Sequence, residues 1–379
     1  MTTRDFTANV ISASKVVPDG NFKDSKASGV WDINEALDLI KGGNWPNAAN
    51  INPASFVDAL FSTTTYTGTG SSLNVTTGTD LSGSNEGLVW IKDRGASNNH
   101  ALYDTVRGAT KALEGSDTDG AQATEVTGLT AFSSTGFTTG ARNSSGANGN
   151  TYCAWTFRSQ PKFFDIVTYS GSSSDQAIAH NLGSVPGMIL VKCTTQSQYW
   201  SVYHRGMDSS NPENYHMYLN DTSARVDGSP SDWNDTAPTS THFTVNGGEG
   251  RVNSNGQTYV AYLFAHNDDD GGFGEPEDQD IIKCDKYTGN GNETGPEITL
   301  GFEPQFIMIK RASGGTGDWD VYDNMRGIPM GAGEQRLEWN TSDAESTAGA
   351  DRINLSSTGF SIATTNSNVN TNGDTYVYM

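Results

Sequence analysis

The sequence repeats itself three times, and this repetition constrains the fold more than any other feature. Five short motifs and an Arg-Gly pair recur in the same order, at a spacing on the order of 100–120 residues, which is the size of one domain. The first motif ends in Tyr, a small hydroxyl residue and Gly. Its copies are Tyr66-Thr67-Gly68, Tyr169-Ser170-Gly171 and Tyr287-Thr288-Gly289. The pattern indicates three copies of one domain-sized unit rather than a solenoid of short repeats.

The remaining motifs are kept to different degrees by the three copies. An apolar run ending in Lys follows a Leu-Gly-x-x-Pro turn at 182–192 and 300–310, but the first copy at 81–92 lacks the Pro. Trp-x-Val-Tyr occurs at Trp200 and Trp319, whereas the first copy keeps only Ala101-Leu102-Tyr103. An Arg-Gly pair, a Ser-Thr-x-Phe block and a Thr-Tyr after an Asn-Gly turn complete each copy. These are found at Arg107, Arg205 and Arg326, at Phe137, Phe243 and Phe360, and at Tyr152, Tyr259 and Tyr376.

Within one copy the pattern is that of short β-strands joined by tight turns. Residues 188–191 and 306–309 are apolar runs bounded by Pro and Lys, as expected of strands covered on both faces. Asn255-Gly256 and Asn372-Gly373 supply residues that accept a positive φ in a tight turn. We therefore predict an all-β fold of tandem β-sandwich or jelly-roll repeats.

Four parts are expected along the chain. An N-terminal segment occupies residues 1–60, and a row of three β-sandwich repeats follows at 61–160, 161–272 and 273–379. The third repeat stops at Met379, inside its closing strand, whereas the second runs on to Ala265. Two expectations follow: the chain is the N-terminal part of a longer polypeptide, or another chain completes the strand.

The N-terminal segment lacks the repeat and is expected to be mainly extended, with one short helix. The apolar residues of this helix lie at helical spacing, and a tryptophan flanks each end. A helix of about two turns is marginal alone in water, so it needs a surface to pack on. We predict docking on a partner protein; the alternative is packing on the first repeat. The predicted docking residues are Trp31, Ile33, Leu37, Ile40 and Trp45.

Charge and cysteine content exclude several classes of partner and compartment. The formal net charge is -21, which disfavours nucleic acid and anionic membranes as partners. No apolar run approaches the ~20 residues that a membrane span needs. The three cysteines have no metal or redox spacing, so we expect buried free thiols. The N-terminus has no apolar signal region, which predicts synthesis in a cytoplasm.

Two parts of the sequence resemble a known protein family. Residues Ser28 to Pro46 look like the N-terminal segment of tail-fibre-like structural proteins of marine tailed phages. The unit from Leu182 to Ala265 is similar to a repeat of those proteins and, in outline, to lectin-like β-sandwich modules. The resemblance covers nearly the whole chain and is weakest in the first repeat. It implies a tail-associated virion component, a homotrimer, and no catalytic residues to carry over.

No residue pattern that carries catalysis repeats across the copies, so we expect neither an enzyme nor a required cofactor. The six histidines do not pair at ligand spacing, and no phosphate loop or nucleophile elbow is present. Chance pairs among the 44 acidic residues leave a glycan-cleaving site open. The acidic linker could bind calcium through Asp268, Asp269 and Asp270; its alternative is a solvated linker.

The tryptophans divide into two groups. Trp200 and Trp319 recur at the same place and are expected to pack in the core. Trp233 and Trp339 lie in turn-rich polar stretches and are candidates for contact with a host surface glycan.

Together these features predict a phage virion structural protein, a tail fibre or tail-associated protein located in the virion tail and made in the host cytoplasm. Its N-terminal segment would anchor to other tail proteins, and its repeats would project toward the host surface. The alternatives are a capsid decoration or head-fibre protein, and a glycan-binding adhesin outside any virus. The adhesin would require a secretion signal, which the sequence does not display.

Overall fold

The computed structural model describes residues 56–115, 120–228, 230–274, 278–331, 333–347 and 349–379. Regular structure in these ranges is nearly all β, in several antiparallel sheets, which confirms the predicted fold class. The described helical elements are short: α2 (Val57–Leu60), α3 (Gly250–Asn253) and a 3-10 turn, η3 (Pro212–Asn214). No helix in the described ranges is long and apolar enough to cross a bilayer.

The first repeat (residues 57–158) forms a six-stranded sheet, ordered β1-β9-β3-β4-β5-β6, and a three-stranded sheet, β2-β8-β7. Its strands are β1 Phe61–Thr67, β2 Leu73–Thr76, β3 Gly87–Asp93, β4 Ala101–Asp104, β5 Lys111–Glu114, β6 Ala123–Thr124, β7 Leu129–Ser133, β8 Gly136–Thr139 and β9 Thr151–Arg158.

The second repeat (residues 163–265) has a six-stranded sheet, β10-β17-β12-β13-β14-β15, and a two-stranded sheet, β11-β16. Its strands are β10 Phe164–Ser170, β11 Gln176–Ala179, β12 Met188–Cys193, β13 Ser201–His204, β14 Tyr215–Tyr218, β15 Val226–Asp227, β16 His242–Val245 and β17 Thr258–Phe264.

The third repeat (residues 281–379) has a six-stranded sheet, β18-β26-β20-β21-β22-β23, and a three-stranded sheet, β19-β25-β24. Its strands are β18 Asp285–Thr288, β19 Glu297–Thr299, β20 Phe306–Arg311, β21 Trp319–Asp323, β22 Gln335–Glu338, β23 Ser346–Thr347, β24 Ile353–Ser356, β25 Gly359–Ile362 and β26 Thr375–Tyr378. The larger sheets of the three repeats thus share one strand order, in which the closing strand lies beside the opening one.

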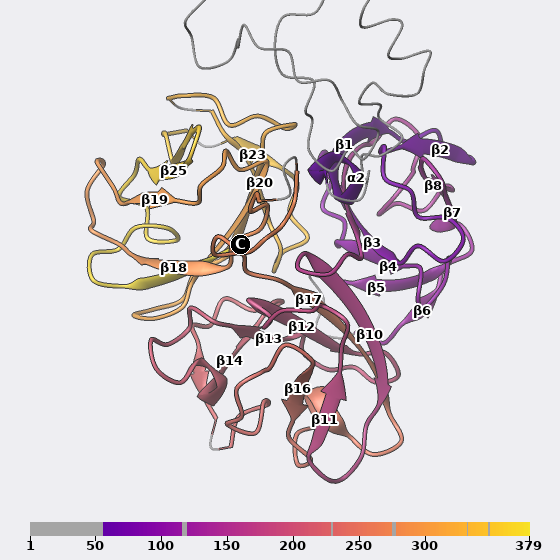
Figure 1. Ribbon diagram of the computed structural model, residues 1–379. Coiled ribbons are helices and arrows are strands. Elements are labelled where there is room, and N and C mark those ends of the chain that lie inside the picture. The colour runs from indigo at the N-terminus through magenta and orange to yellow at the C-terminus, as the bar shows by residue number, and fades with distance from the viewer. Residues whose placement is uncertain (1–55, 116–119, 229, 275–277, 332, 348) are drawn as a thin grey trace, which may run out of the picture.

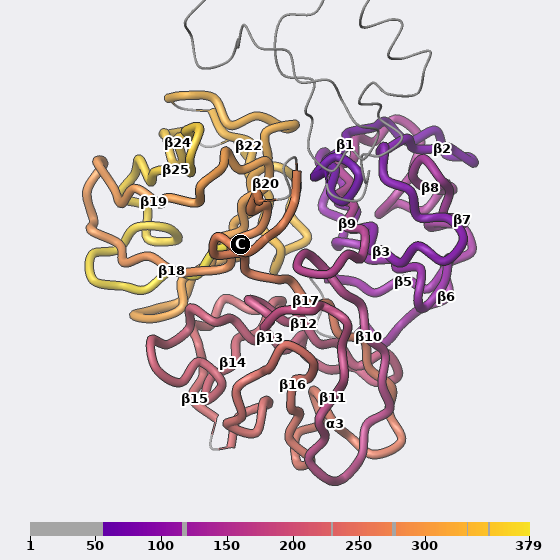
Figure 2. The backbone as a smooth tube through the Cα atoms, in the orientation of Figure 1, coloured from indigo at the N-terminus to yellow at the C-terminus, as the bar shows by residue number. Residues whose placement is uncertain are grey.

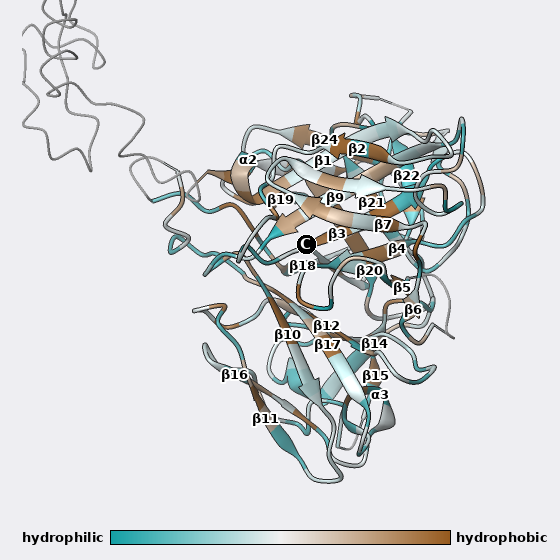
Figure 3. Cartoon of the chain, turned by 90° about the vertical axis from the view of Figure 1, so that its right-hand side faces the viewer, coloured by the Kyte–Doolittle hydropathy of each residue, from teal (hydrophilic) through white to brown (hydrophobic). Residues whose placement is uncertain are grey.

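The central strands of each six-stranded sheet, β3, β12 and β20, are buried on both faces, which explains their continuous apolar runs. In β3, Leu88 and Trp90 belong to a central core, while Val89 and Ile91 pack against the small sheet of the same repeat. Strand β20 alternates in the same way, with Met308 central. The brown hydrophobic segments in Figure 3 accordingly lie mainly on strands such as β3, β4 and β9.

The central core is shared by all three repeats. It joins large side chains that come from the inner faces of the three six-stranded sheets. These include Trp90, Trp155, Phe157, Trp200, Tyr262, Phe264, Phe306, Trp319 and Trp339. Figures 1 and 2 show three lobes around a common centre, with the C-terminus near the middle of the view. The expected row of repeats is therefore wrong: they form a closed triangle, because each sheet has an apolar inner face that only the other repeats cover.

The first and last sequence motifs meet in each repeat. Their tyrosines lie opposite each other on the opening and closing strands, and the rings stack with centroids 5.1–5.2 Å apart. The three pairs are Tyr66–Tyr152, Tyr169–Tyr259 and Tyr287–Tyr376. In every pair the hydroxyl of the first tyrosine donates to a loop carbonyl at 2.7 Å, so the motif ties the closing loop to the sheet.

Candidate functional site

Three equivalent hydrogen bonds close the repeats into a ring. In each, an aromatic N–H at or just before the start of β4, β13 or β21 donates to a backbone carbonyl of the preceding repeat. That carbonyl lies at the end of β22, β5 or β14, respectively. The bonds are His100 Nε2 to Glu338 O at 3.1 Å, Trp200 Nε1 to Glu114 O at 3.0 Å and Trp319 Nε1 to Tyr218 O at 2.9 Å. The interfaces therefore run head to tail and close after three units, as a cyclic homotrimer would.

His100 takes the place of the tryptophan that the first repeat lacks. Trp90 Nε1 donates to His100 Nδ1 at 2.7 Å, so Nδ1 is an acceptor and the proton of the neutral ring lies on Nε2. That proton is then directed at the carbonyl of Glu338. Burial lowers the pKa of His100 well below its ordinary value, which keeps the ring neutral.

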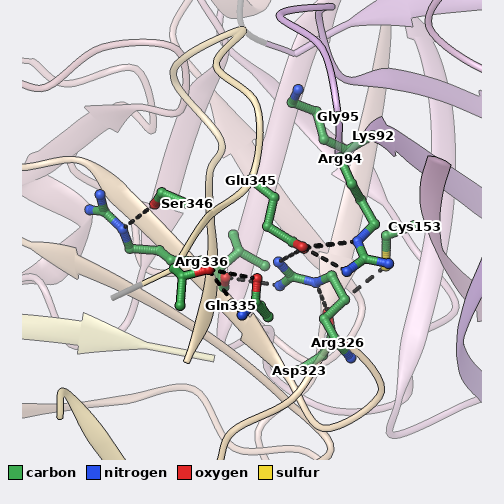
Figure 4. Close-up of polar contacts among 12 residues, drawn as sticks. Lys92, Arg94, Gly95, Cys153, Asp323, Arg326, Gln335, Arg336, Glu345 and Ser346 are labelled. Carbon is green, nitrogen blue, oxygen red and sulfur yellow. Dashed lines mark hydrogen bonds and ion pairs between the residues drawn. The ribbon is translucent and has the colours of Figure 1, made fainter. Parts of the chain in front are cut away.

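A buried ion pair reinforces the interface between the first and third repeats (Figure 4). Arg326 Nε lies 2.5 Å from Asp323 Oδ2, and both side chains are inaccessible to solvent. Trp155 Nε1 of the first repeat donates to the same carboxylate oxygen at 3.0 Å. Glu345 bridges Arg326, at 3.1 Å, to Arg94 of the first repeat, whose Nε donates at 2.9 Å. Each buried charge therefore has an opposite charge and a hydrogen-bond partner.

The interface between the first and second repeats copies this arrangement. Arg107 Nε lies 2.5 Å from Asp104 Oδ2, at the same i,i+3 spacing as Asp323 and Arg326. Tyr262, which corresponds to Trp155, donates its hydroxyl hydrogen to Asp104 at 2.7 Å. The Arg107 guanidinium donates in turn to the Tyr262 oxygen at 3.1 Å.

The interface between the second and third repeats replaces the ion pair with less polar groups. His204 and Met207 occupy the positions of the Asp and the Arg, at the end of β13 and three residues later. Gly206 N donates to His204 Nδ1, so His204 Nε2 donates to Tyr378 O at 3.0 Å. Burial lowers the pKa of His204 to about 3. The ring thus has two interfaces with a buried Asp-Arg pair and one in which His204 and Met207 replace that pair.

Each repeat also buries the lysine that ends its main apolar run. Lys92, Lys192 and Lys310 are all inaccessible to solvent. Lys92 Nζ donates to Asp93 O at 2.8 Å and to Ser342 O of the third repeat at 3.1 Å. Lys310 Nζ donates to Gly317 O and, at 2.8 Å, to Thr222 O of the second repeat. Burial lowers the pKa of Lys92 and of Lys310 to about 8.

An apolar cavity of about 200 Å³ lies where the described chain begins and ends. Its wall includes Val57 from the start of the first repeat and Met379 from the end of the third. Phe157 and Phe306 line it from the central core, and Ile282 lines it from the segment before β18. The cavity is therefore continuous with the contacts that hold the repeats together.

A polar hollow of about 350 Å³ lies at the junction of the first and third repeats. Its wall is made of amide, hydroxyl and charged side chains: Ser97, Asn98, Asn99, Glu114, Arg142, Asn143, Ser144 and Ser342. The Ser144 hydroxyl is buried without a hydrogen-bond partner in the described chain. Arg142 is held by an ion pair with Glu114 and by a 3.1 Å bond to the Tyr103 hydroxyl. Such a lining suits a neutral polar ligand.

The tryptophans predicted to contact glycans are buried, so that prediction is wrong. Trp233 and Trp339 are each 1% exposed. Trp233 packs edge-on against Tyr203, with ring centroids 5.9 Å apart. Trp339 packs against Trp90 and His100 of the first repeat and near Trp200 of the second. Trp339 therefore lies at the ring centre, between the repeats, and not on the surface.

The other predicted residues have different outcomes. The docking residues Trp31, Ile33, Leu37, Ile40 and Trp45 lie outside the described residues. The possible calcium ligands Asp268, Asp269 and Asp270 do not form a site: within the described ranges no group of three acidic, His or Cys side chains could hold a metal. Asp268 is instead 79% exposed and pairs with Lys283 at 3.4 Å.

Sequence reasoning missed the residues that join the repeats. Arg107 and Arg326 recur in the sequence as Arg-Gly pairs, but the signal that explains them is the Asp three residues earlier. Arg205 is also followed by Gly, yet Met207 holds the place in the second repeat that corresponds to these two arginines. His100 gave no signal, because only the alignment of the strands shows that it replaces a tryptophan.

The family of a domain of unknown function (DUF7483) matches residues 57–379, which are the three repeats. Neither the curated proteins nor the solved structures include a match to the chain.

Proposed function

Because the chain belongs to the DUF7483 family, for which no function is described, we propose a function from its own residues. It is a structural protein of a bacteriophage virion, associated with the tail. Its N-terminal segment anchors it to other tail proteins, and the ring of repeats projects from the particle toward the host. The resemblance of Ser28 to Pro46 and of Leu182 to Ala265 to tail-fibre-like proteins is the origin of this proposal.

The observation that carries the proposal is where the chain enters the ring. Val57 and Met379 line the same cavity, so the residues that precede the ring join it at this one place. The inner faces of the six-stranded sheets are buried in contacts between repeats, and the small sheets face outward. A rigid body attached through one end is the geometry expected of a module held away from a particle.

Imaging of intact particles with a gold-labelled antibody tests the location. The proposal expects label along or beside the tail. Label on the head would favour capsid decoration or a head fibre instead. Absence of label from every particle would remove the virion assignment and favour an adhesin outside any virus.

Anchoring is tested by deleting residues 1–55 and leaving the ring unchanged. The truncated chain should fold with the circular dichroism spectrum of the full ring but should not assemble onto particles. A second variant, Trp31→Ser with Trp45→Ser, should lose attachment in the same way. The matched control is Met330→Ser, since Met330 is 87% exposed on the ring and takes no part in the proposed anchor. Normal attachment of the deletion variant would contradict the proposal.

The proposal includes a homotrimer. Light scattering of the purified chain should then give three times the 40.4 kDa of one copy. A mass equal to that of one copy would contradict the homotrimer, and the only threefold arrangement would then be that of the three repeats within each chain.

A second candidate function, binding of a host glycan, is favoured by the polar hollow. Its volume of about 350 Å³ and its amide and hydroxyl lining suit a short saccharide. Asn143→Trp should fill the hollow and abolish binding on a glycan array, while the backbone carbonyl of residue 143 still accepts from Tyr152. Thr236→Trp, at an exposed position of the second repeat, is the control. Equal binding by both variants would exclude the hollow.

A further inference from the structure

Two carboxyl groups contact each other where the two sheets of the third repeat meet. Glu334 immediately precedes β22 of the six-stranded sheet, and Asp351 lies two residues before β24 of the three-stranded sheet. Glu334 is inaccessible to solvent. Its burial, together with its contact with Asp351, raises the pKa of the Glu334 carboxyl. Two groups that both favour a negative charge are thus held together out of water.

Each of the two carboxyl groups has one oxygen with hydrogen-bond donors and one without. Glu334 Oε1 accepts from the backbone N–H of Arg352 at 2.6 Å and of Ile353 at 3.0 Å. Asp351 Oδ2 accepts from Asn354 Nδ2 at 2.9 Å. The other oxygens, Glu334 Oε2 and Asp351 Oδ1, are buried without a donor in the described chain, and so is Asn354 Oδ1. Three oxygen acceptors therefore await a positively charged partner on side chains that adjoin one another.

The arginines nearest in the sequence do not supply that positive charge. Arg352 Nη1 pairs with Asp320 at 3.2 Å, and Arg336 Nη1 pairs with the same carboxylate at 3.2 Å. Burying a charge without a partner is strongly unfavourable, and a second like charge beside it adds repulsion. Glu334 and Asp351 consequently need either a cation or a shared proton.

A carboxylate at this position is specific to the third repeat. The residue that precedes the corresponding strand is Thr110 in the first repeat and Asn214 in the second. In the first repeat Thr110 N donates directly to O of Leu129, the first residue of β7, at 2.8 Å. In the third repeat the Glu334 side chain takes the place of this backbone contact. The two carboxyl groups are therefore an addition to the common repeat, which folds elsewhere without them.

The oxygen donors present suit calcium better than other common cations. Carboxylate and amide oxygens are the ligands of hard cations, whereas softer metals select sulfur and imidazole. Calcium accepts about six to eight oxygens in a flexible geometry. Magnesium retains several of its waters, for which a buried site leaves little room.

We propose that Glu334, Asp351 and Asn354 form a calcium site that joins the two sheets of the third repeat. The two carboxylates neutralise the ion and the Asn354 oxygen is a third ligand, while water or backbone carbonyls complete the shell. Bound calcium fixes the start of β24 against the start of β22. The site involves contacts within one repeat and does not depend on where the protein is located.

Calcium should stabilise the full chain after treatment with a chelator. With a Kd of about 10⁻⁴ M or lower, about 10 mM calcium should raise the thermal midpoint by roughly 3–6 °C. Magnesium at the same concentration should give less than about half of this rise. An unchanged midpoint would overturn the proposal. So would an equal rise with magnesium, since it would indicate general screening of the net charge of -21.

Glu334→Gln and Asp351→Asn test the ligands. Each substitution removes one charge and keeps an oxygen that can accept the existing hydrogen bonds, so the fold should be retained. Both variants should lose the calcium-dependent rise, and calorimetric titration should show binding weakened at least about tenfold. The matched control is Asp268→Asn, which removes an equal charge from a side chain that is 79% exposed and should keep the full rise. A wild-type calcium response in Glu334→Gln would overturn the proposal.

A shared proton is the competing explanation, and pH distinguishes it from calcium. Calcium must displace the proton, so its effect on the midpoint should grow from about pH 5 to about pH 7.5. If the pair only holds a proton, stability falls as pH rises through the raised pKa of Glu334, and Glu334→Gln removes that dependence. This behaviour, with no calcium effect at any pH, would overturn the proposal.

Discussion

At Gly68, Gly171 and Gly289 the opening strand passes so close to the closing loop that a side chain has no room. A Cβ at Gly171 would lie 2.1 Å from Ser254 O, and the distances at the other two glycines are 2.3 and 2.2 Å. The approach is what allows the preceding tyrosine to bond to a loop carbonyl, as Tyr169 does to Val252 O. The Tyr-x-Gly motif therefore reports a backbone contact rather than a turn.

Gly171→Ala should destabilise the protein by about 1–3 kcal/mol, because the loop must move away from the added methyl group. The control is Gly256→Asn, at a turn where φ is +75° and nothing lies within 4 Å of a built Cβ. Asn adopts positive φ readily, so the control should cost little. Urea unfolding of both variants measures the difference, and similar losses would show that the close approach does not matter.

At the scale of elements, each main apolar run ends in a buried lysine, and two of the three, Lys92 and Lys310, donate hydrogen bonds across an interface. The pKa of Lys92 and of Lys310 is lowered to about 8, against about 10.5 for the unfolded chain. Between these values the unfolded chain binds more protons, so stability rises with pH; below pH 8 the cost of the buried charges is fully present.

The free energy of unfolding should therefore increase from pH 7.5 to 9.5, by roughly 1–2 kcal/mol per lysine. Urea titrations at each pH should compare the wild type with a Lys92→Met/Lys310→Met variant. Other groups titrate equally in both proteins, so the lysine contribution is the difference between the two slopes. Parallel slopes would mean that these lysines keep their ordinary pKa in the folded protein.

The ion pairs at two interfaces should be strongly coupled. Arg326→Met leaves the Asp323 carboxylate buried with only the neutral donors Trp155 and Cys153 as its side-chain partners across the interface, and should cost about 3–5 kcal/mol. Adding Asp323→His copies the His204 and Met207 pair of the third interface and should recover part of that loss. Arg225→Met, which removes a pair whose side chains are 25% and 26% exposed, should cost no more than about 1 kcal/mol.

A double-mutant cycle over Asp323 and Arg326 measures this coupling from unfolding free energies. Additive losses would indicate that the two side chains act independently in spite of their 2.5 Å contact.

The sequence predicted the strands and turns within each repeat, but it did not predict how the repeats contact one another. Strands and turns were predictable because Tyr, Gly and the apolar runs recur at equal positions in every repeat. The ring was not, because the residues that join the repeats differ from one interface to the next. His100 stands for a tryptophan, and His204 with Met207 stands for an Asp-Arg pair. A search for identical motifs cannot find contacts that are conserved in position and varied in chemistry.

At the scale of the whole molecule, the shared core makes the three repeats depend on one another. Trp90 and Trp155 of the first repeat are covered in part by Phe306 and Trp339 of the third. Truncation after residue 272 should therefore expose the inner faces of the first two repeats. We expect binding of the dye ANS, association in size-exclusion chromatography and loss of the cooperative thermal transition.

The control for this truncation is deletion of residues 1–55, which leaves the described ring complete and should unfold in one transition without binding ANS. If the two-repeat chain were monomeric, did not bind ANS and unfolded cooperatively, the repeats would be independently folding domains and the prediction would be contradicted.

The differences among the three interfaces also bear on how such a gene can change. Nearly identical tandem segments recombine with each other, and the products lose, gain or exchange a segment. Here an exchanged repeat would bring the buried Asp104–Arg107 pair against the groups that face His204 and Met207, and the pair would lose the hydrogen bonds that it makes with Tyr262. Each repeat therefore fits one place in the order, and shuffled descendants would fail to close. The differences among the three interfaces therefore act against changes in the number and the order of the repeats.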